Sequence, residues 1–114
     1  MSGKVTVNGT TVTISLSDQT TGESVTKSLQ MSQPDTSSAE WIAEAPGGSR
    51  GRFNLAQFAN IEFAADKAWA GSTVYLAQTW PHYAIVMWNQ YEDALPSGFN
   101  SSGTAFTAYW RNEY

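Results

Sequence analysis

Two glutamates in one short segment are the side chains of this sequence best suited to acid–base chemistry. Glu40 and Glu44 lie in residues 37–46, SSAEWIAEAP. If this segment is a strand, both carboxylates share one face with Ile42, whereas Trp41 lies on the other. The Cα atoms of the two glutamates would then be roughly 13 Å apart, so the carboxylates cannot share a proton. A catalytic partner must come from another strand; the alternative is a solvated outer sheet face.

A second group of candidate residues is aromatic and lies in the C-terminal half of the chain. We treat four of them as candidate substrate-binding residues: Trp69, Trp80, Trp88 and Tyr83. Aromatic rings on a sheet can stack on sugars or clasp a peptide, but they can equally pack between two sheets. His82 stands between Pro81 and Tyr83, which predicts a loop residue rather than a catalytic base.

Composition excludes several classes of site. The 114 residues contain no Cys and one His, which leaves no thiol nucleophile and no Cys- or His-based metal site. The acidic residues do not have the spacing of a calcium loop, so we expect neither a metal nor another cofactor. Six basic residues against ten acidic ones give a net charge of −4, which disfavours nucleic-acid binding. No apolar run is long enough to span a membrane, and the first residues, MSGK, lack the apolar core of a signal peptide.

Apolar and polar residues alternate along most of the chain, as they do in half-buried antiparallel strands. Residues 4–7 and 11–17 flank Asn8-Gly9, a sequence typical of a two-residue hairpin turn. Further strands are predicted at residues 24–31, 39–45, 58–63, 73–79, 84–88 and 104–111, and loops at residues 64–72 and 91–103. About eight short strands without a long helical period predict a single all-β domain over residues 1–114, an antiparallel β-sandwich.

Four segments in order resemble one known family. Residues 37–46 (SSAEWIAEAP) are similar to the SAEWIxEAP signature of the glutamic peptidases, the eqolisins of peptidase family G1. Residues 16–24 (LSDQTTGES) resemble the LTDxTTGxS turn of this family, and residues 55–63 (LAQFANIEF) resemble its LAxFxxVxF strand. Residues 104–110 are similar to its last strand. The resemblance is best over residues 4–63, whereas residues 64–103 diverge and are rich in aromatic side chains.

The resemblance implies a secreted enzyme that cleaves peptide bonds in acid. It implies a lectin-like (concanavalin-like) sandwich of two curved sheets and a catalytic pair of one Glu and one Gln. On the motif match the catalytic Glu is Glu44, with Glu40 as the alternative. A carboxylate remains a competent base at a pH where histidine is protonated, and a neutral amide can stabilise the oxyanion at any pH.

The sequence departs from the family at the catalytic Gln. Its six glutamines are Gln19, Gln30, Gln33, Gln57, Gln78 and Gln90, and none stands in a segment like the Gln-bearing stretch of the family. The resemblance therefore implies a C-terminal half, completed by a homodimer partner, by a complementing N-terminal half, or by strands rebuilt from residues 64–103. Two hypotheses remain: a glutamic-peptidase-like domain acting on a peptide or protein, and a non-catalytic module that binds a glycan, a peptide or a partner subunit.

Overall fold

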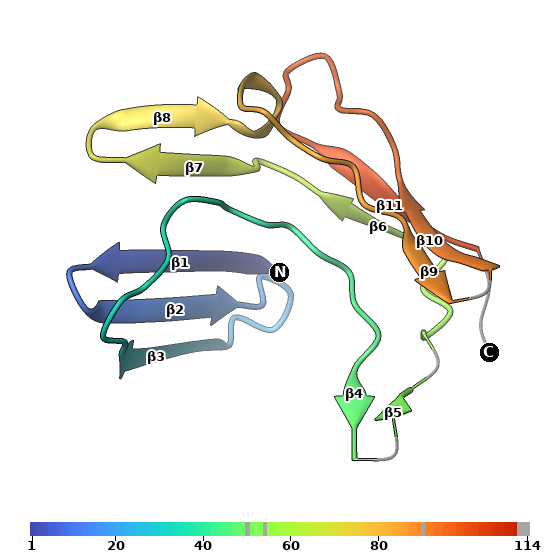
Figure 1. The fold of residues 1–114 in the computed structure, drawn as a ribbon, viewed down its shortest axis with the longest axis horizontal. Helices are drawn as coiled ribbons and strands as arrows, with labels where there is room; N and C mark the ends of the chain where they lie inside the picture. The colour runs from blue at the N-terminus through green and yellow to red at the C-terminus, as the bar shows by residue number, and fades with distance from the viewer. Residues whose placement is uncertain (50, 54, 90, 112–114) are drawn as a thin grey trace. The chain divides into compact units, whose positions relative to one another are not determined.

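The computed structural model describes residues 1–49, 51–53, 55–89 and 91–111 (Figure 1). The chain separates into two compact units, Met1–Ala39 and Glu40–Tyr114. We call them the N-terminal unit and the C-terminal unit and describe each by itself. Both are built from antiparallel strands, so the predicted all-β class is confirmed.

The N-terminal unit is one antiparallel sheet of three strands. They are β1 (Ser2–Asn8), β2 (Thr11–Ser17) and β3 (Ser24–Gln30), in the order β1-β2-β3. The predicted hairpin is present: Asn8 pairs with Thr11 across the turn, and Gly9 takes the left-handed φ of 59° that this turn requires. The turn from β2 to β3 is closed by Asp18, whose carboxylate accepts a hydrogen bond from the Thr20 amide at 2.8 Å.

The two faces of this sheet differ in chemistry because side chains alternate along each strand. One face carries hydroxyls that bond across β2 and β3, with Thr13 to Ser28 at 2.9 Å and Ser15 to Thr26 at 3.0 Å. The other face is apolar except for Lys27. We call this the apolar face of the N-terminal unit, and its members are Val5, Val7, Val12, Ile14, Leu16, Val25 and Leu29.

The C-terminal unit holds a four-stranded sheet and two short hairpins. The sheet has the order β6-β11-β10-β9, formed by β6 (Asn60–Phe63), β9 (Met87–Asn89), β10 (Tyr91–Pro96) and β11 (Phe106–Trp110). One hairpin pairs β7 (Lys67–Ala70) with β8 (Thr73–Leu76), and the other pairs β4 (Gly47–Gly48) with β5 (Gly51–Arg52). A 3-10 turn, η1 (Ala77–Thr79), comes after β8. No described helix is long and apolar enough to cross a membrane.

The core of the C-terminal unit is small. Three nearly inaccessible side chains form it, Ala45, Leu55 and Ala94, and three partly buried ones pack against them, Phe58, Met87 and Trp110. These residues come from the segment before β4, the segment before β6, strands β9 and β10, and the end of β11. The fold thereby anchors Ala45, the residue directly after Glu44, against the four-stranded sheet.

The structure corrects several predicted elements. Residues 39–45 are not a strand, because no described strand pairs with them. The predicted loops at residues 64–72 and 91–103 contain β7 and β10, and η1 occupies the end of the predicted strand at residues 73–79. Strand β10 has the sequence YEDALP, which has poor strand propensity, but it lies between β9 and β11 and is paired on both sides. Tertiary pairing therefore overrides local preference.

Candidate functional site

The segment of residues 40–45 keeps the alternation of a strand although it is outside the sheets. Glu40 and Glu44 are exposed, and the side chain of Ile42 between them is 57% exposed. Trp41 is half-buried, and Ala45 is only 4% exposed. The segment thus presents both carboxylates and Ile42 on its open side and turns Trp41, Ala43 and Ala45 inward. The predicted separation of Trp41 from the two glutamates is retained without a paired strand.

Glu44 is positioned by the two residues on its C-terminal side. Ala45 packs in the core with Leu55 and Ala94. The Pro46 carbonyl accepts a hydrogen bond from the Phe53 amide at 2.9 Å, next to the hairpin of β4 and β5. The backbone on this side of Glu44 is therefore fixed, whereas its carboxylate faces solvent. Such a carboxylate can reach a water molecule and an incoming peptide.

The described glutamines differ in how they are held. Gln30 on β3 exchanges hydrogen bonds with the hydroxyls of Thr10 and Thr11 at 3.1 and 3.0 Å, so its amide is engaged within the N-terminal unit. The described glutamines in the unit that holds Glu44 are Gln57 and Gln78, both exposed. Gln90 lies outside the described residues. The geometry therefore singles out no glutamine as a partner of Glu44.

The four candidate substrate-binding aromatics lie on separate elements. Trp69 on β7 and Trp88 on β9 are 60% and 62% exposed, and Tyr83, in the segment between η1 and β9, is 88% exposed. Trp80 comes directly after η1 and packs on Tyr75, with ring centroids 4.3 Å apart. Three of the four are thus available to a ligand, and their role in binding stays a prediction.

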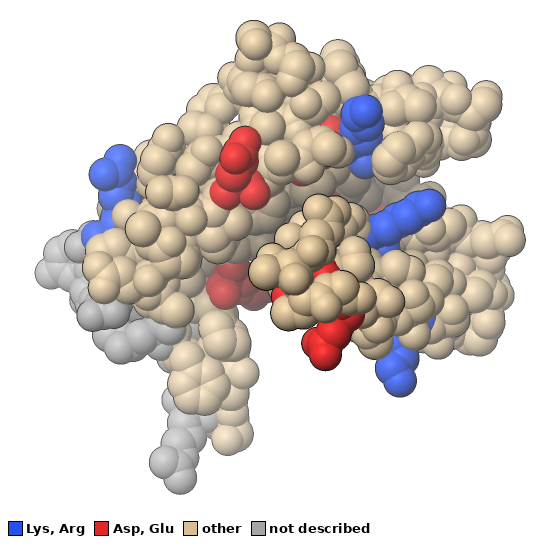
Figure 2. Space-filling model, turned by 180° about the vertical axis from the view of Figure 1, so that it is seen from behind, with Lys and Arg blue, Asp and Glu red and all other residues tan. Residues whose placement is uncertain are grey.

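His82 has a structural setting. Its Nδ1 lies 2.9 Å from the Trp80 carbonyl oxygen, and its ring meets Phe99 edge-on at 4.9 Å. It lies in an irregular segment, as the sequence predicts. Among the described residues no three His, Cys, Asp or Glu side chains form a group that could hold a metal. Most of the surface in Figure 2 is neither acidic nor basic, in keeping with the low charge content.

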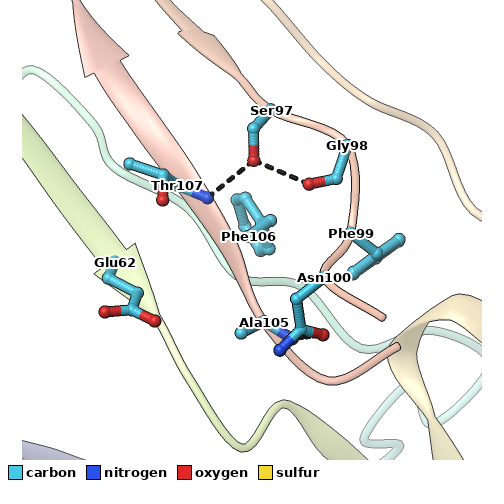
Figure 3. A pocket seen from close by; sticks show the side chains of 8 residues that line it. All are labelled: Glu62, Ser97, Gly98, Phe99, Asn100, Ala105, Phe106 and Thr107. Carbon is cyan, nitrogen blue, oxygen red and sulfur yellow. Dashed lines mark hydrogen bonds between the residues drawn. The ribbon is translucent and has the colours of Figure 1, made fainter. Parts of the chain in front are cut away.

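A small pocket lies on the four-stranded sheet, beside the loop that joins β10 to β11 (Figure 3). Its volume is about 140 Å³, and it is lined by Glu62 of β6 and by residues 97–100 and 105–107. The Ser97 hydroxyl accepts a hydrogen bond from the Thr107 amide at 3.0 Å and donates one to the Gly98 carbonyl at 2.7 Å. None of the candidate aromatics and neither Glu40 nor Glu44 lines this pocket.

The side chain of Asn100 holds the same loop together. In the amino-acid sequence Asn100 stands out only as the first residue of Asn-Ser-Ser. The side-chain oxygen of Asn100 accepts hydrogen bonds from the amides of Thr104 and Ala105 at 3.1 and 3.2 Å and from the Ser102 hydroxyl at 3.0 Å. Loops closed in this way by Asn are common, because its amide mimics a backbone turn. The side chain of Asn100 thus defines the conformation of this loop.

Asp66 is the one charged side chain that is buried among the described residues. Sequence analysis does not single it out. It is 4% exposed, and its Oδ2 has no hydrogen-bond partner among the described residues. Burial raises the pKa of the Asp66 carboxyl to about 6. Its local sequence, AADKA, resembles an ordinary polar loop, and burial arises only when distant segments meet over it. A single sequence carries no signal for such a residue.

Comparison with known proteins places this geometry in a family. The model of the peptidase A4 family matches residues 1–108. The chain belongs to the peptidase A4 family. This confirms the resemblance to the glutamic peptidases that the AEWI segment and the three other blocks indicate. No curated protein sequence matches the chain.

One solved structure shares the fold. The crystal structure of aspergilloglutamic peptidase from Aspergillus niger superimposes with a TM-score of 0.74 at 22% sequence identity. The match covers 96% of this chain and 66% of that one. The likeness confirms the predicted fold class, the antiparallel β-sandwich of the glutamic peptidases. The chain spans about two-thirds of the length of this relative, so it does not cover the whole of that enzyme.

Proposed function

We propose that this peptidase A4 family member is the Glu-bearing part of an acid endopeptidase and that Glu44 is its general base. The observation that carries the proposal is the setting of Glu44. Its carboxylate is exposed, whereas the next residue is fixed in the core. Membership of the family supports peptide-bond hydrolysis as the reaction class. The substrate is a peptide or protein in extended conformation, which offers its carbonyl groups to such a side chain.

The chemistry needs one carboxylate in two protonation states. Glu44 removes a proton from water while the water oxygen attacks the carbonyl carbon of the scissile bond. The resulting oxyanion requires a neutral donor, for which an amide is suited in acid. The protonated Glu44 then gives its proton to the leaving nitrogen as the carbon–nitrogen bond breaks, which restores the carboxylate. The proposed steps therefore need the Glu44 carboxylate, an amide donor and a water molecule.

The oxyanion donor is proposed to be a glutamine supplied by a homodimer partner or a complementing N-terminal half. The described glutamines support this, since Gln30 is held by Thr10 and Thr11, and no sequence motif distinguishes Gln57 or Gln78. We propose an extracellular, acidic location for the protein, because the proposed chemistry works where carboxylates are partly protonated.

Cleavage of denatured haemoglobin between pH 2 and 6 tests the proposal. New peptide termini are identified by mass spectrometry for the wild type, Glu44→Gln and Glu40→Gln. We expect Glu44→Gln to lower the cleavage rate at least about 100-fold, because positioned general acid–base groups contribute that much or more. Glu40→Gln is the matched control, an exposed glutamate on the same side of the segment, and should stay within a few-fold of wild type.

Two results would change the assignment. Loss of cleavage in Glu40→Gln alone would make Glu40 the base, and cleavage that survives both substitutions would refute the mechanism. Absence of cleavage by the wild type would favour the second candidate, a non-catalytic binding module. The exposure of Trp69, Trp88 and Tyr83 supports that candidate. It predicts quenching or shift of tryptophan fluorescence when a peptide or oligosaccharide is added.

A further inference from the structure

The connection between β6 and β7 contains the buried residue Asp66. The role of Asp66 argued below is independent of peptidase activity. Asp66 is 4% exposed. The residue before it, Ala65, has a φ of 60°, in the left-handed region that costs an L-residue roughly 1 kcal/mol or more. Surrounding contacts must therefore hold this connection in place.

Three segments distant in sequence meet at Asp66 through their backbones. The Asp66 amide donates to the Thr104 carbonyl at 2.8 Å, and the Asp66 carbonyl accepts from the Ala77 amide at 3.3 Å. The Gln78 amide donates to the Gly103 carbonyl at 3.2 Å. The β6–β7 connection, η1 and the β10–β11 loop are thus bound to one another. We call this arrangement the Asp66 joint.

The Asp66 carboxylate lacks the partners that a buried charge needs. Its Oδ2 is buried without a hydrogen bond to any residue that the structure describes. The described titratable groups on neighbouring elements are Glu62 of β6, Lys67 of β7 and Tyr75 of β8, and His82 lies against Phe99 of the β10–β11 loop. Residues 97–105 and η1 contain no titratable side chain. Desolvation is the cause that raises the Asp66 pKa, and within the described part of the chain no ion pair compensates it.

The sign of the pH effect comes from this pKa. A carboxyl whose pKa is raised from 3.8 to about 6 binds its proton more tightly when the joint is closed than when it is open. The stabilisation is fully present below about pH 3.8 and is lost as the pH rises through about 6. Above that range the closed joint must bury an unpaired negative charge, which favours opening.

We propose that Asp66 is a proton-dependent clasp that holds the β10–β11 loop closed in acid and releases it at neutral pH. The loop also forms one wall of the pocket, through residues 97–100. Opening of the joint therefore frees the Gly103–Thr104 end of the loop, next to the pocket residue Ala105, whereas Ser97 stays bonded to Thr107. The pocket is thus supported on all sides only in acid. One buried carboxyl is thereby coupled to the order of the pocket on the four-stranded sheet.

Hydrogen exchange of the full chain tests the clasp. The amides of Asp66 and Gln78 report on the joint, and the amide of Met31, which donates to the Thr10 carbonyl in the N-terminal unit, is the internal reference. After correction for intrinsic exchange rates, we expect protection at residues 66 and 78 to fall up to about 100-fold between pH 4 and pH 7.5. In Asp66→Asn the fall should be absent. Glu62→Gln, a nearby exposed carboxyl, should behave as wild type.

If Asp66→Asn does not fold, titration of the Asp66 carboxyl by NMR in the wild type provides the test. The midpoint of the protection loss should coincide with the midpoint of this titration. The clasp is refuted if wild type and Asp66→Asn show the same pH dependence at the joint. It is refuted as well if the carboxyl titrates in the range of an exposed Asp.

Discussion

Gly103 shows how tightly individual residues of the C-terminal unit are packed at the Asp66 joint. It is buried and has a φ of +69°. A Cβ at this position would lie 2.5 Å from Oε1 and 3.0 Å from Cβ of Gln78. The first atom can move away because it ends a flexible side chain, but the second is fixed by the η1 backbone. Both backbone conformation and close approach therefore require glycine here.

Substitution of Gly103 by Ala should destabilise the protein by about 1–3 kcal/mol, from the left-handed conformation and the contact with Gln78 together. Urea unfolding monitored by tryptophan fluorescence measures this. Gly98→Ala is the matched control in the same loop, because nothing lies within 4 Å of its added Cβ. It should change the free energy of unfolding by less than about 0.5 kcal/mol. Equal effects of the two substitutions would disprove the packing argument.

Among the elements, the turn between β2 and β3 depends on pH in the sense opposite to the Asp66 joint. The Thr20 amide donates to the Asp18 carboxylate, and this bond is the main reason that the Asp18 pKa is lowered from its usual value. A lowered folded-state pKa gives stability that is present above the unfolded value of 3.8 and is lost as the pH falls through the folded-state pKa. Acid therefore weakens this turn, whereas it strengthens the joint.

The substitution Asp18→Ala should lower the thermal stability of the N-terminal unit at pH 6 and should lower it less at pH 2. Circular dichroism melts at the two pH values measure the difference. Glu23→Gln serves as control, since Glu23 contributes its backbone carbonyl to the turn, as acceptor for the Asp18 amide, and its side chain is exposed. An equal loss at both pH values would mean that the charge of Asp18 does not stabilise the turn.

Local signals explain which elements could be predicted from the sequence. The hairpin of β1 and β2 is encoded by Asn8-Gly9 and strict alternation, both of which act over a few residues. Strand β10 could not be predicted, because Glu92, Asp93 and Pro96 disfavour strands and only its neighbours in the sheet impose one. For the candidate site, the alternation around Glu44 was predictable. The burial of Asp66 was not, because it requires contacts made across the fold.

At the scale of the whole molecule, the apolar face of the N-terminal unit is a surface that nothing within that unit covers. Val12 on the central strand β2 is 8% exposed, whereas the six other apolar side chains of this face are between 38% and 64% exposed. Soluble monomers rarely leave so many adjacent apolar side chains open, and such patches usually mark a contact surface. The opposite face of the same sheet is covered by serine and threonine hydroxyls and needs no partner.

We therefore predict that the chain forms a homodimer that covers this face. Light scattering at high concentration should give twice the 12.4 kDa of one chain. The substitution Val5→Lys places a charge on the apolar face, where Val5 is 64% exposed, and should shift the mass toward the monomer. Thr6→Lys places the same charge on the neighbouring residue of β1, which faces the hydroxyl side, and should leave the dimer intact. A wild-type mass of 12.4 kDa at every concentration would contradict the dimer. It would mean that one chain completes its own sandwich.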